Sequence, residues 1–179
     1  MVQTVAPMPE EMPRELWRGY KPESAHGQGS VAAIFIAPNS ADVMISLARV
    51  RAFADRGLEG DRFFRDSWSA VKRSDKAVSL IEEEVLDIAA QEVGVEGLGK
   101  LSRRNLVTRG VALIDLLGRE FTVGNVRMRG IRLFEPCAHL VQVSKLPGIF
   151  KALEHRSGLK AALVSDGEIR IGDAIVLGD

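Results

Sequence analysis

The stretch FTVGNVRMRGIRL, residues 121–133, carries the pattern that decides the fold class. Gly124 and Asn125 separate two runs rich in β-branched and aromatic residues, and a two-residue connection of this kind is typical of a β-hairpin. Working outward, three more short apolar runs predict strands: 31–37, 50–54 and 76–80. A second hairpin is predicted at 161–171, turning at Asp166.

Two helices are predicted among these strands. The first spans about 81–93, because Ser79 and Glu82 have the spacing of an N-terminal capping box and apolar residues follow at helical intervals. The second spans about 147–155, between a proline and a glycine. Many short strands with few helices predict a mainly β (α+β) fold, a β-barrel or curled sheet with two or more peripheral helices.

The composition suits one globular domain of 179 residues, 46% apolar and 27% charged. Its 24 basic and 24 acidic side chains cancel, and only 6% of residues are aromatic, so a nucleic-acid partner is not expected. The longest apolar run, 31–38, is too short to span a bilayer. A single cysteine fits a reducing compartment, so we expect a cytoplasmic protein without a membrane partner, whose oligomeric state the sequence does not specify.

Residues 1–29 are expected to form an N-terminal extension, and residues 30–179 the main domain. Four prolines in the extension argue against one continuous helix. Trp17 and Tyr20 are expected to dock it onto the body, because about thirty residues bury too little surface to fold alone. The polar residues 65–76 are expected to form a loop.

Cys137 is the first candidate for chemistry, and His139 lies two residues beyond it. A neighbouring cation favours the thiolate form of a cysteine, which is a nucleophile, a sulfur carrier and a soft metal ligand. If the chain stays extended here, the side chains of Glu135, Cys137 and His139 point the same way. The alternative is that Cys137 is a small buried apolar residue without a chemical role.

A local excess of positive charge is the second candidate. Eight cations and only two acids lie between Lys100 and Arg132, and they include the pair Arg103-Arg104. Guanidinium groups suit phosphate and other oxyanions, although a solvated face paired with the acidic 82–96 region is the alternative. The third candidate is the segment GLEGDRF at 57–63, a tight glycine-containing loop that either approaches a ligand or is a plain turn.

Together these segments resemble the molybdenum-cofactor sulfurase C-terminal (MOSC) domain family, in particular its free-standing bacterial members. The matching blocks are GLEGDR at 57–62, LIE at 80–82, RRNLVTRGV at 103–111, LGREFTVG at 117–124, EPC at 135–137 and IRIGD at 169–173. Their order and spacing cover nearly the whole chain from Val31 to Leu177. The arginine pair, the glycine-arginine block and the proline-cysteine pair are specific in this combination.

The resemblance implies a β-barrel that is associated with the molybdenum cofactor. It makes Cys137 either a carrier of persulfide sulfur or a ligand of molybdenum. We expect catalytic roles for Cys137 and His139. The expected cofactor-binding residues are Gly60, Asp61, Arg62, Arg103, Arg104, Asn105 and Arg109. Cys137 should then lie in a concave site bordered by segments 57–62 and 103–109.

Three functions stay open at this point. The leading one is a molybdenum-cofactor-associated domain that works with a cysteine desulfurase. The second is a molybdenum-dependent reductase of N-hydroxylated compounds that takes electrons from a partner protein, since no flavin or iron–sulfur motif is visible. The third is a non-catalytic barrel that binds an anion or small molecule. With about thirty residues before Val31, neither a desulfurase domain with pyridoxal phosphate nor an additional N-terminal β domain is expected.

Overall fold

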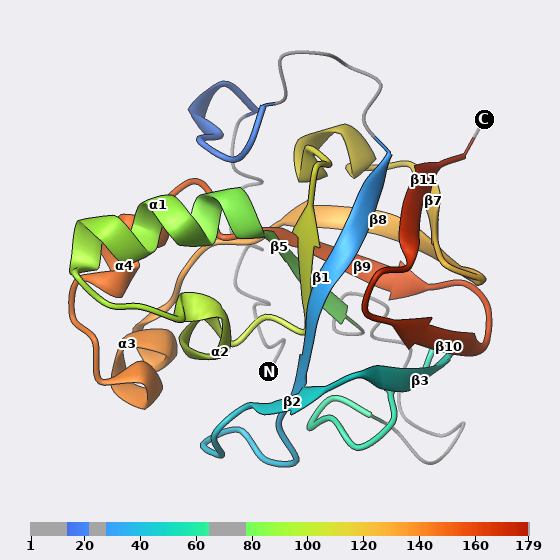
Figure 1. Cartoon of the computed structure of the whole chain (residues 1–179), viewed down its shortest axis with the longest axis horizontal. Helices are drawn as coiled ribbons and strands as arrows, with labels where there is room; N and C mark the ends of the chain where they lie inside the picture. The colour runs from blue at the N-terminus through green and yellow to red at the C-terminus, as the bar shows by residue number, and fades with distance from the viewer. Residues whose placement is uncertain (1–13, 22–27, 65–77, 179) are drawn as a thin grey trace, which may run out of the picture.

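The computed structural model describes residues 14–21, 28–64 and 78–178 (Figure 1). Within these ranges, seven strands form a closed mixed barrel in the order β11-β7-β8-β9-β5-β6-β1, and β1 pairs again with β11. The barrel strands are β1 (Gly29–Ile36), β5 (Val78–Glu82), β6 (Leu106–Arg109), β7 (Glu120–Val123), β8 (Val126–Leu133), β9 (Leu159–Leu163) and β11 (Ala174–Leu177). The predicted β-barrel is therefore confirmed, and the predicted loop 65–76 lies outside the described residues.

The hairpin predicted around Gly124 and Asn125 is confirmed, with Val123 paired to Val126. The second predicted hairpin, at 161–171, is wrong. Its first half, β9, pairs with β5 and β8, whereas β10 (Gly167–Arg170) leaves the barrel and pairs with β3 (Arg49–Phe53). The cause is Asp166, whose Oδ1 accepts the Ala54 N–H at 2.7 Å and ties the turn to the end of β3.

A second, small sheet has the order β10-β3-β4, where β4 is Gly57–Leu58. The short β2 (Ile45–Leu47) pairs with β1 and leads into β3. Four helices gather on one side of the barrel (Figure 1). They are α1 (Glu83–Val93), α2 (Leu98–Ser102), α3 (Ala138–Ser144) and α4 (Ile149–Leu153). Helices α1 and α2 connect β5 to β6, which run parallel, as a helical crossover is expected to do.

The first helix starts later than its sequence pattern predicts, at Glu83. The predicted capping box is wrong, because Ser79 lies inside β5 and its side chain bonds to Asn105 instead of to a helix terminus. Of the predicted apolar face, Ile88 is 48% exposed. The predicted 147–155 helix is also shorter, since the backbone leaves helical geometry at Glu154, and the sequence pattern missed α3.

Two apolar clusters hold the fold together. One fills the barrel and includes Phe121, Leu80 and Met128, each at most 1% exposed. The other lies between the barrel wall and the helices and includes Phe35 and Ile149. The part of the extension that is described, residues 14–21, contributes Trp17 to the barrel cluster at 2% exposure. No helix among the described residues is long and apolar enough to span a membrane.

Candidate functional site

Cys137 lies between the end of β8 and the start of α3, and its thiol is exposed. The chain does not stay extended beyond it, so the expected alignment of Glu135, Cys137 and His139 is wrong. His139 is on the first turn of α3, with its Nε2 3.2 Å from the Ser40 carbonyl oxygen. Glu135 instead accepts the N–H of His155 and lies 2.9 Å from its Nδ1. The hydrogen bonds that the structure describes for these two side chains therefore go to residues other than Cys137.

Arg104 is the cation that the fold buries beside Cys137. Its guanidinium donates to the carbonyl and hydroxyl of Ser157, at 2.9 and 2.5 Å, and to the Ser102 carbonyl at 3.0 Å. It also stacks 3.8 Å from the centroid of the Phe134 ring. Burial lowers the pKa of Arg104 to about 9, and the negative charge of a Cys137 thiolate opposes that shift. Arg104 therefore remains a cation at neutral pH.

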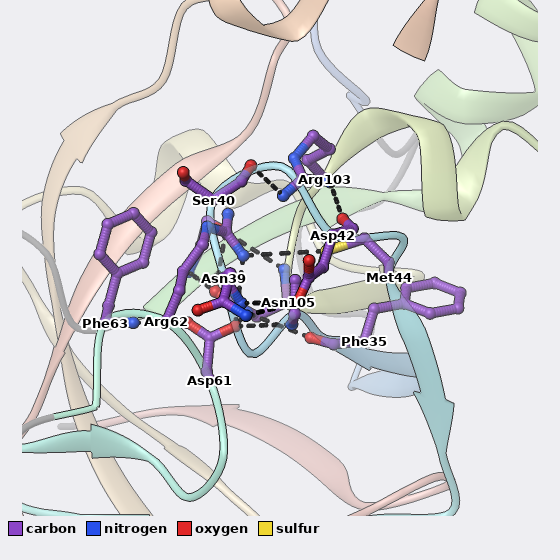
Figure 2. Close-up of polar contacts among 12 residues, drawn as sticks. Phe35, Asn39, Ser40, Asp42, Met44, Asp61, Arg62, Phe63, Arg103 and Asn105 are labelled. Atoms are coloured by element: carbon purple, nitrogen blue, oxygen red, sulfur yellow. Dashed lines mark hydrogen bonds and ion pairs between the residues drawn. The ribbon is translucent and has the colours of Figure 1, made fainter. Parts of the chain in front are cut away.

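Arg103 and Arg62 extend the positive charge around Arg104. Both are near enough that their charges lower the pKa of Arg104 further. Arg103 donates to the carbonyl oxygens of Ser40 and Asp42 at 2.8 and 2.7 Å, and this anchors the loop after β1 (Figure 2). Arg62 packs on the Phe63 ring and lies 3.3 Å from the Asp61 carboxylate. Burial lowers the pKa of both arginines.

Asp61 and Asn105 join the two segments that border the site (Figure 2). Asp61 is 5% exposed and accepts the Ala37 N–H, the Asn105 amide and the Phe63 N–H at 3.1–3.2 Å. The Asn105 side-chain oxygen accepts both the N–H and the hydroxyl of Ser79. All their bonds run within the protein, so Asp61 and Asn105 hold the frame of the site. The predicted 57–62 border therefore contacts the start of the predicted 103–109 border, and the concave site at Cys137 stays a prediction.

Replacing Asp61 with alanine should lower the free energy of unfolding by about 3 kcal/mol, because buried donors at Ala37 and Asn105 lose their acceptor. Urea unfolding measures this. Asp42→Ala is the matched control: its carboxylate bonds only at the surface to Asn39, so the cost should stay below about 1 kcal/mol. Equal costs for the two variants would show that the Asp61 network does not stabilise the fold.

Two of the expected cofactor-binding residues, Arg109 and Gly60, have other roles in the structure. Arg109 lies at the far end of β6, is exposed, and pairs with Glu83 on α1, which is the surface ion pair that the alternative interpretation anticipated. Gly60 is exposed with a φ of +79°, so its role in the structure is to turn the loop into Asp61. Neither residue belongs to the group of cations formed by Arg62, Arg103 and Arg104.

The sequence interpretation missed the aromatic and lysine components of the site. The Phe134 ring is approached by Arg104, by Arg132 at 5.5 Å and by Lys160 at 4.7 Å, and Lys160 also lies 5.4 Å from Phe63. The signal was available in the spacing RLFEPC at 132–137. Lys160 had no comparable signal, because it reaches the site only through strand pairing. We call Arg62, Arg103, Arg104, Arg132 and Lys160 the cationic cluster.

The chemistry of this site suits an anionic ligand with a soft centre. Within the described residues, no group of three His, Cys, Asp or Glu side chains could hold a metal ion by itself. The site offers one soft sulfur group, that of Cys137, together with several positive charges. The positive side chains repel a hard divalent cation and attract an oxyanion.

Comparisons with known proteins agree with the fold. The sequence profile of the MOSC domain matches residues 48–176. The YuaD protein from Bacillus subtilis has a similar structure, with a TM-score of 0.70 and 16% identity over 84% of this chain and 95% of that one. YiiM from Geobacillus stearothermophilus has a TM-score of 0.65 and 18% identity over 84% and 75%. YiiM from Escherichia coli has a TM-score of 0.63 and 17% identity over 85% and 70%. No curated protein sequence matches.

Proposed function

This chain belongs to the MOSC domain family, and we propose that it binds the molybdenum cofactor with Cys137 as the thiolate that meets the metal. One observation carries the proposal: Cys137 is exposed and lies within electrostatic reach of the buried Arg104, which Arg62, Arg103 and Arg132 surround with further positive charge. A sulfur carrier needs only the exposed thiol. A cofactor with phosphate and a thiophilic metal accounts for both the thiol and the charge.

Each residue would have its own role in such a site. Cys137 offers the soft ligand, and when bound, the cofactor would supply two-electron redox chemistry at its metal. Arg104 keeps a fixed positive charge near the sulfur, and such a charge suits a ligand group that carries negative charge. The Phe134 ring packs against Arg104 and the Phe63 ring lies near Lys160, which adds cation–π attraction to the cluster.

A second candidate function, the persulfide carrier, is favoured by the exposure of Cys137. In that reaction the Cys137 thiolate attacks the outer sulfur of a desulfurase persulfide, a new S–S bond forms on Cys137, and the donor cysteine leaves as a thiolate. Such a carrier must be reachable by another protein, which an exposed thiol allows. The two candidates are separated by what the protein carries when it is purified.

Purification from a host that makes the cofactor should give protein with near-stoichiometric molybdenum and pterin, measured by elemental analysis and by fluorescence of the oxidised pterin. Cys137→Ser should lower the molybdenum content at least tenfold, because an alcohol is a poor ligand for a soft metal. Ser144→Ala, at the other end of α3, is the control and should keep both components.

A protein that contains neither molybdenum nor pterin, but gains one sulfur on Cys137 when treated with a cysteine desulfurase and cysteine, would establish the carrier instead. Mass spectrometry of the intact chain detects that sulfur directly, and Cys137 is the single cysteine that can hold it. A protein that takes up neither cofactor nor sulfur would leave both candidates without support.

A further inference from the structure

The chain between α4 and β9 contacts both parts of the candidate site. His155 donates its N–H to one carboxylate oxygen of Glu135 at 2.9 Å, and its ring Nδ1 lies 2.9 Å from the other oxygen. Two residues later, Ser157 accepts hydrogen bonds from Arg104 with both its carbonyl and its hydroxyl. Glu135 in turn precedes Cys137 by two residues. One short stretch of chain therefore holds the turn that carries the sulfur and also the cation within electrostatic reach of it.

His155 has a backbone conformation that side chains seldom adopt. Its φ is +60°, in the left-handed region that favours glycine, so the position carries backbone strain. Three hydrogen bonds hold it there: the two to Glu135, and one in which the His155 carbonyl accepts the Arg18 N–H at 2.7 Å. Glycine would fit this backbone without strain, but it has no ring to bond to Glu135. The imidazole is what distinguishes His155 from the residue that the backbone favours.

The bonds to Glu135 matter because of where this residue lies in the chain. It belongs to the short connection between β8 and α3. In that connection Pro136 has no N–H to donate, and the Cys137 carbonyl accepts the Leu140 N–H only as the helix starts. The Glu135 carboxylate ties the middle of the connection to the neighbouring chain. The placement of the sulfur therefore depends on how firmly Glu135 is held.

We propose that His155 is a positioning residue for Cys137: by holding Glu135, it keeps the sulfur within reach of the positive charge of Arg104. The tautomer with its proton on Nδ1 bonds to one carboxylate oxygen while the backbone N–H bonds to the other, so the carboxylate is fixed at two points. The inference deepens the proposed function, and it rests on that function only for the identity of the group that meets the sulfur. It also connects the N-terminal segment to the site, because Arg18 bonds to the carbonyl of the same histidine.

Two alkylating reagents measure the charge around the sulfur. Iodoacetate and iodoacetamide react in the same way: the Cys137 thiolate forms a bond to the CH₂ carbon, and iodide leaves. Iodoacetate carries a negative charge and iodoacetamide does not, so the ratio of their rates reports the positive potential at the sulfur. Cys137 is the single cysteine, so mass spectrometry of the intact full chain gives both rates at pH 7.5 and fixed ionic strength.

His155→Gly suits the backbone but lacks the ring, and it should lower the iodoacetate-to-iodoacetamide ratio by about threefold or more, because the sulfur is no longer held near Arg104. His155→Asn should keep the wild-type ratio, because asparagine tolerates a positive φ and its side-chain amide can donate to Glu135. Asparagine is also uncharged, so this variant separates position from any charge on the imidazole. Asp55→Gly is the backbone control: Asp55 has a φ of +57° in the turn between β3 and β4, and its variant should match the wild type. A wild-type ratio in His155→Gly would overturn the proposal, and so would an equally low ratio in His155→Asn.

Glu135→Ala tests the same idea from the other partner, with a result that differs in sign. Loss of the carboxylate alone makes the surroundings of Cys137 more positive and would raise the ratio. Loss of the anchor moves the sulfur away from Arg104 and lowers it. We expect the ratio to fall, and a rise would overturn the proposal even where His155→Gly does not fold.

The role of His155 and the proposed function fail separately, because alkylation needs neither cofactor nor sulfur donor. If the ratio depends on His155 but the protein is never found with molybdenum, pterin or persulfide, the positioning role stands and the proposed function is wrong. If the wild type carries molybdenum and pterin but the ratio does not depend on His155, the positioning role is wrong and the cofactor proposal stands.

Discussion

Replacing Gly158 with alanine should destabilise the protein by about 4 kcal/mol, a large part of the roughly 5–15 kcal/mol that a domain of this size has. A Cβ at this position would lie 1.9 Å from the carbonyl oxygen of Leu80, and the backbone φ is +103°. Backbone oxygen cannot move aside as the end of a flexible side chain can. Strain and clash therefore add, and urea unfolding should show both.

Gly172→Ala is the control that separates the two contributions. Gly172 also has a positive φ, +89°, but nothing lies within 4 Å of its missing Cβ, so only the backbone strain of about 1–2 kcal/mol remains. Equal losses of unfolding free energy in the two variants would show that the backbone at Leu80 moves away from the added Cβ. Gly158→Ala should also shift the position of the Arg104 guanidinium. Gly158 directly follows Ser157, whose carbonyl and hydroxyl accept hydrogen bonds from Arg104.

Glu82→Gln should stabilise the protein by about 5 kcal/mol at pH 9. The Glu82 carboxyl is completely buried, and one of its oxygens has no hydrogen-bond partner among the described residues. Burial raises its pKa to about 8, against the smaller effect of bonds from backbone N–H groups such as that of Leu113. At alkaline pH a buried negative charge therefore remains unpaired, whereas glutamine keeps the shape without the charge.

The pH dependence has a definite sign. Between the ordinary pKa of about 4.5 and the folded pKa of about 8, the folded protein holds a proton on Glu82 that the unfolded chain has lost. Stability therefore falls by about 1.4 kcal/mol per pH unit across this window as pH rises. The difference between Glu82→Gln and wild type should grow from near zero below pH 4 to its full value above pH 8.

Unfolding curves in urea at several pH values test this difference. Glu96→Gln, an exposed change in the loop after α1, should follow the wild type throughout. A constant difference between Glu82→Gln and wild type over the whole pH range would mean that Glu82 does not titrate inside this window.

Local sequence was sufficient where local chemistry decides the structure. Gly124 and Asn125 specify a tight turn whatever surrounds them, and the apolar run 31–37 is a strand because nothing polar interrupts it. The ordered blocks of glycine, arginine and proline-cysteine were enough to indicate the family, and the sequence profile of that family confirms it. The concentration of cations near Cys137 was visible too, although not which of them would meet there.

Tertiary structure decided everything that depends on partners far away in the chain. The alternation of a strand shows which residues share a face, but it does not specify the neighbouring strand, so Lys160 could not be placed opposite Arg132. The same reason explains Ser79, which has the spacing of a helix cap but bonds to Asn105, 26 residues further along. A short pattern that is compatible with two structures takes the one whose distant partner satisfies its buried polar groups, because leaving such groups unpaired costs more than any local preference provides.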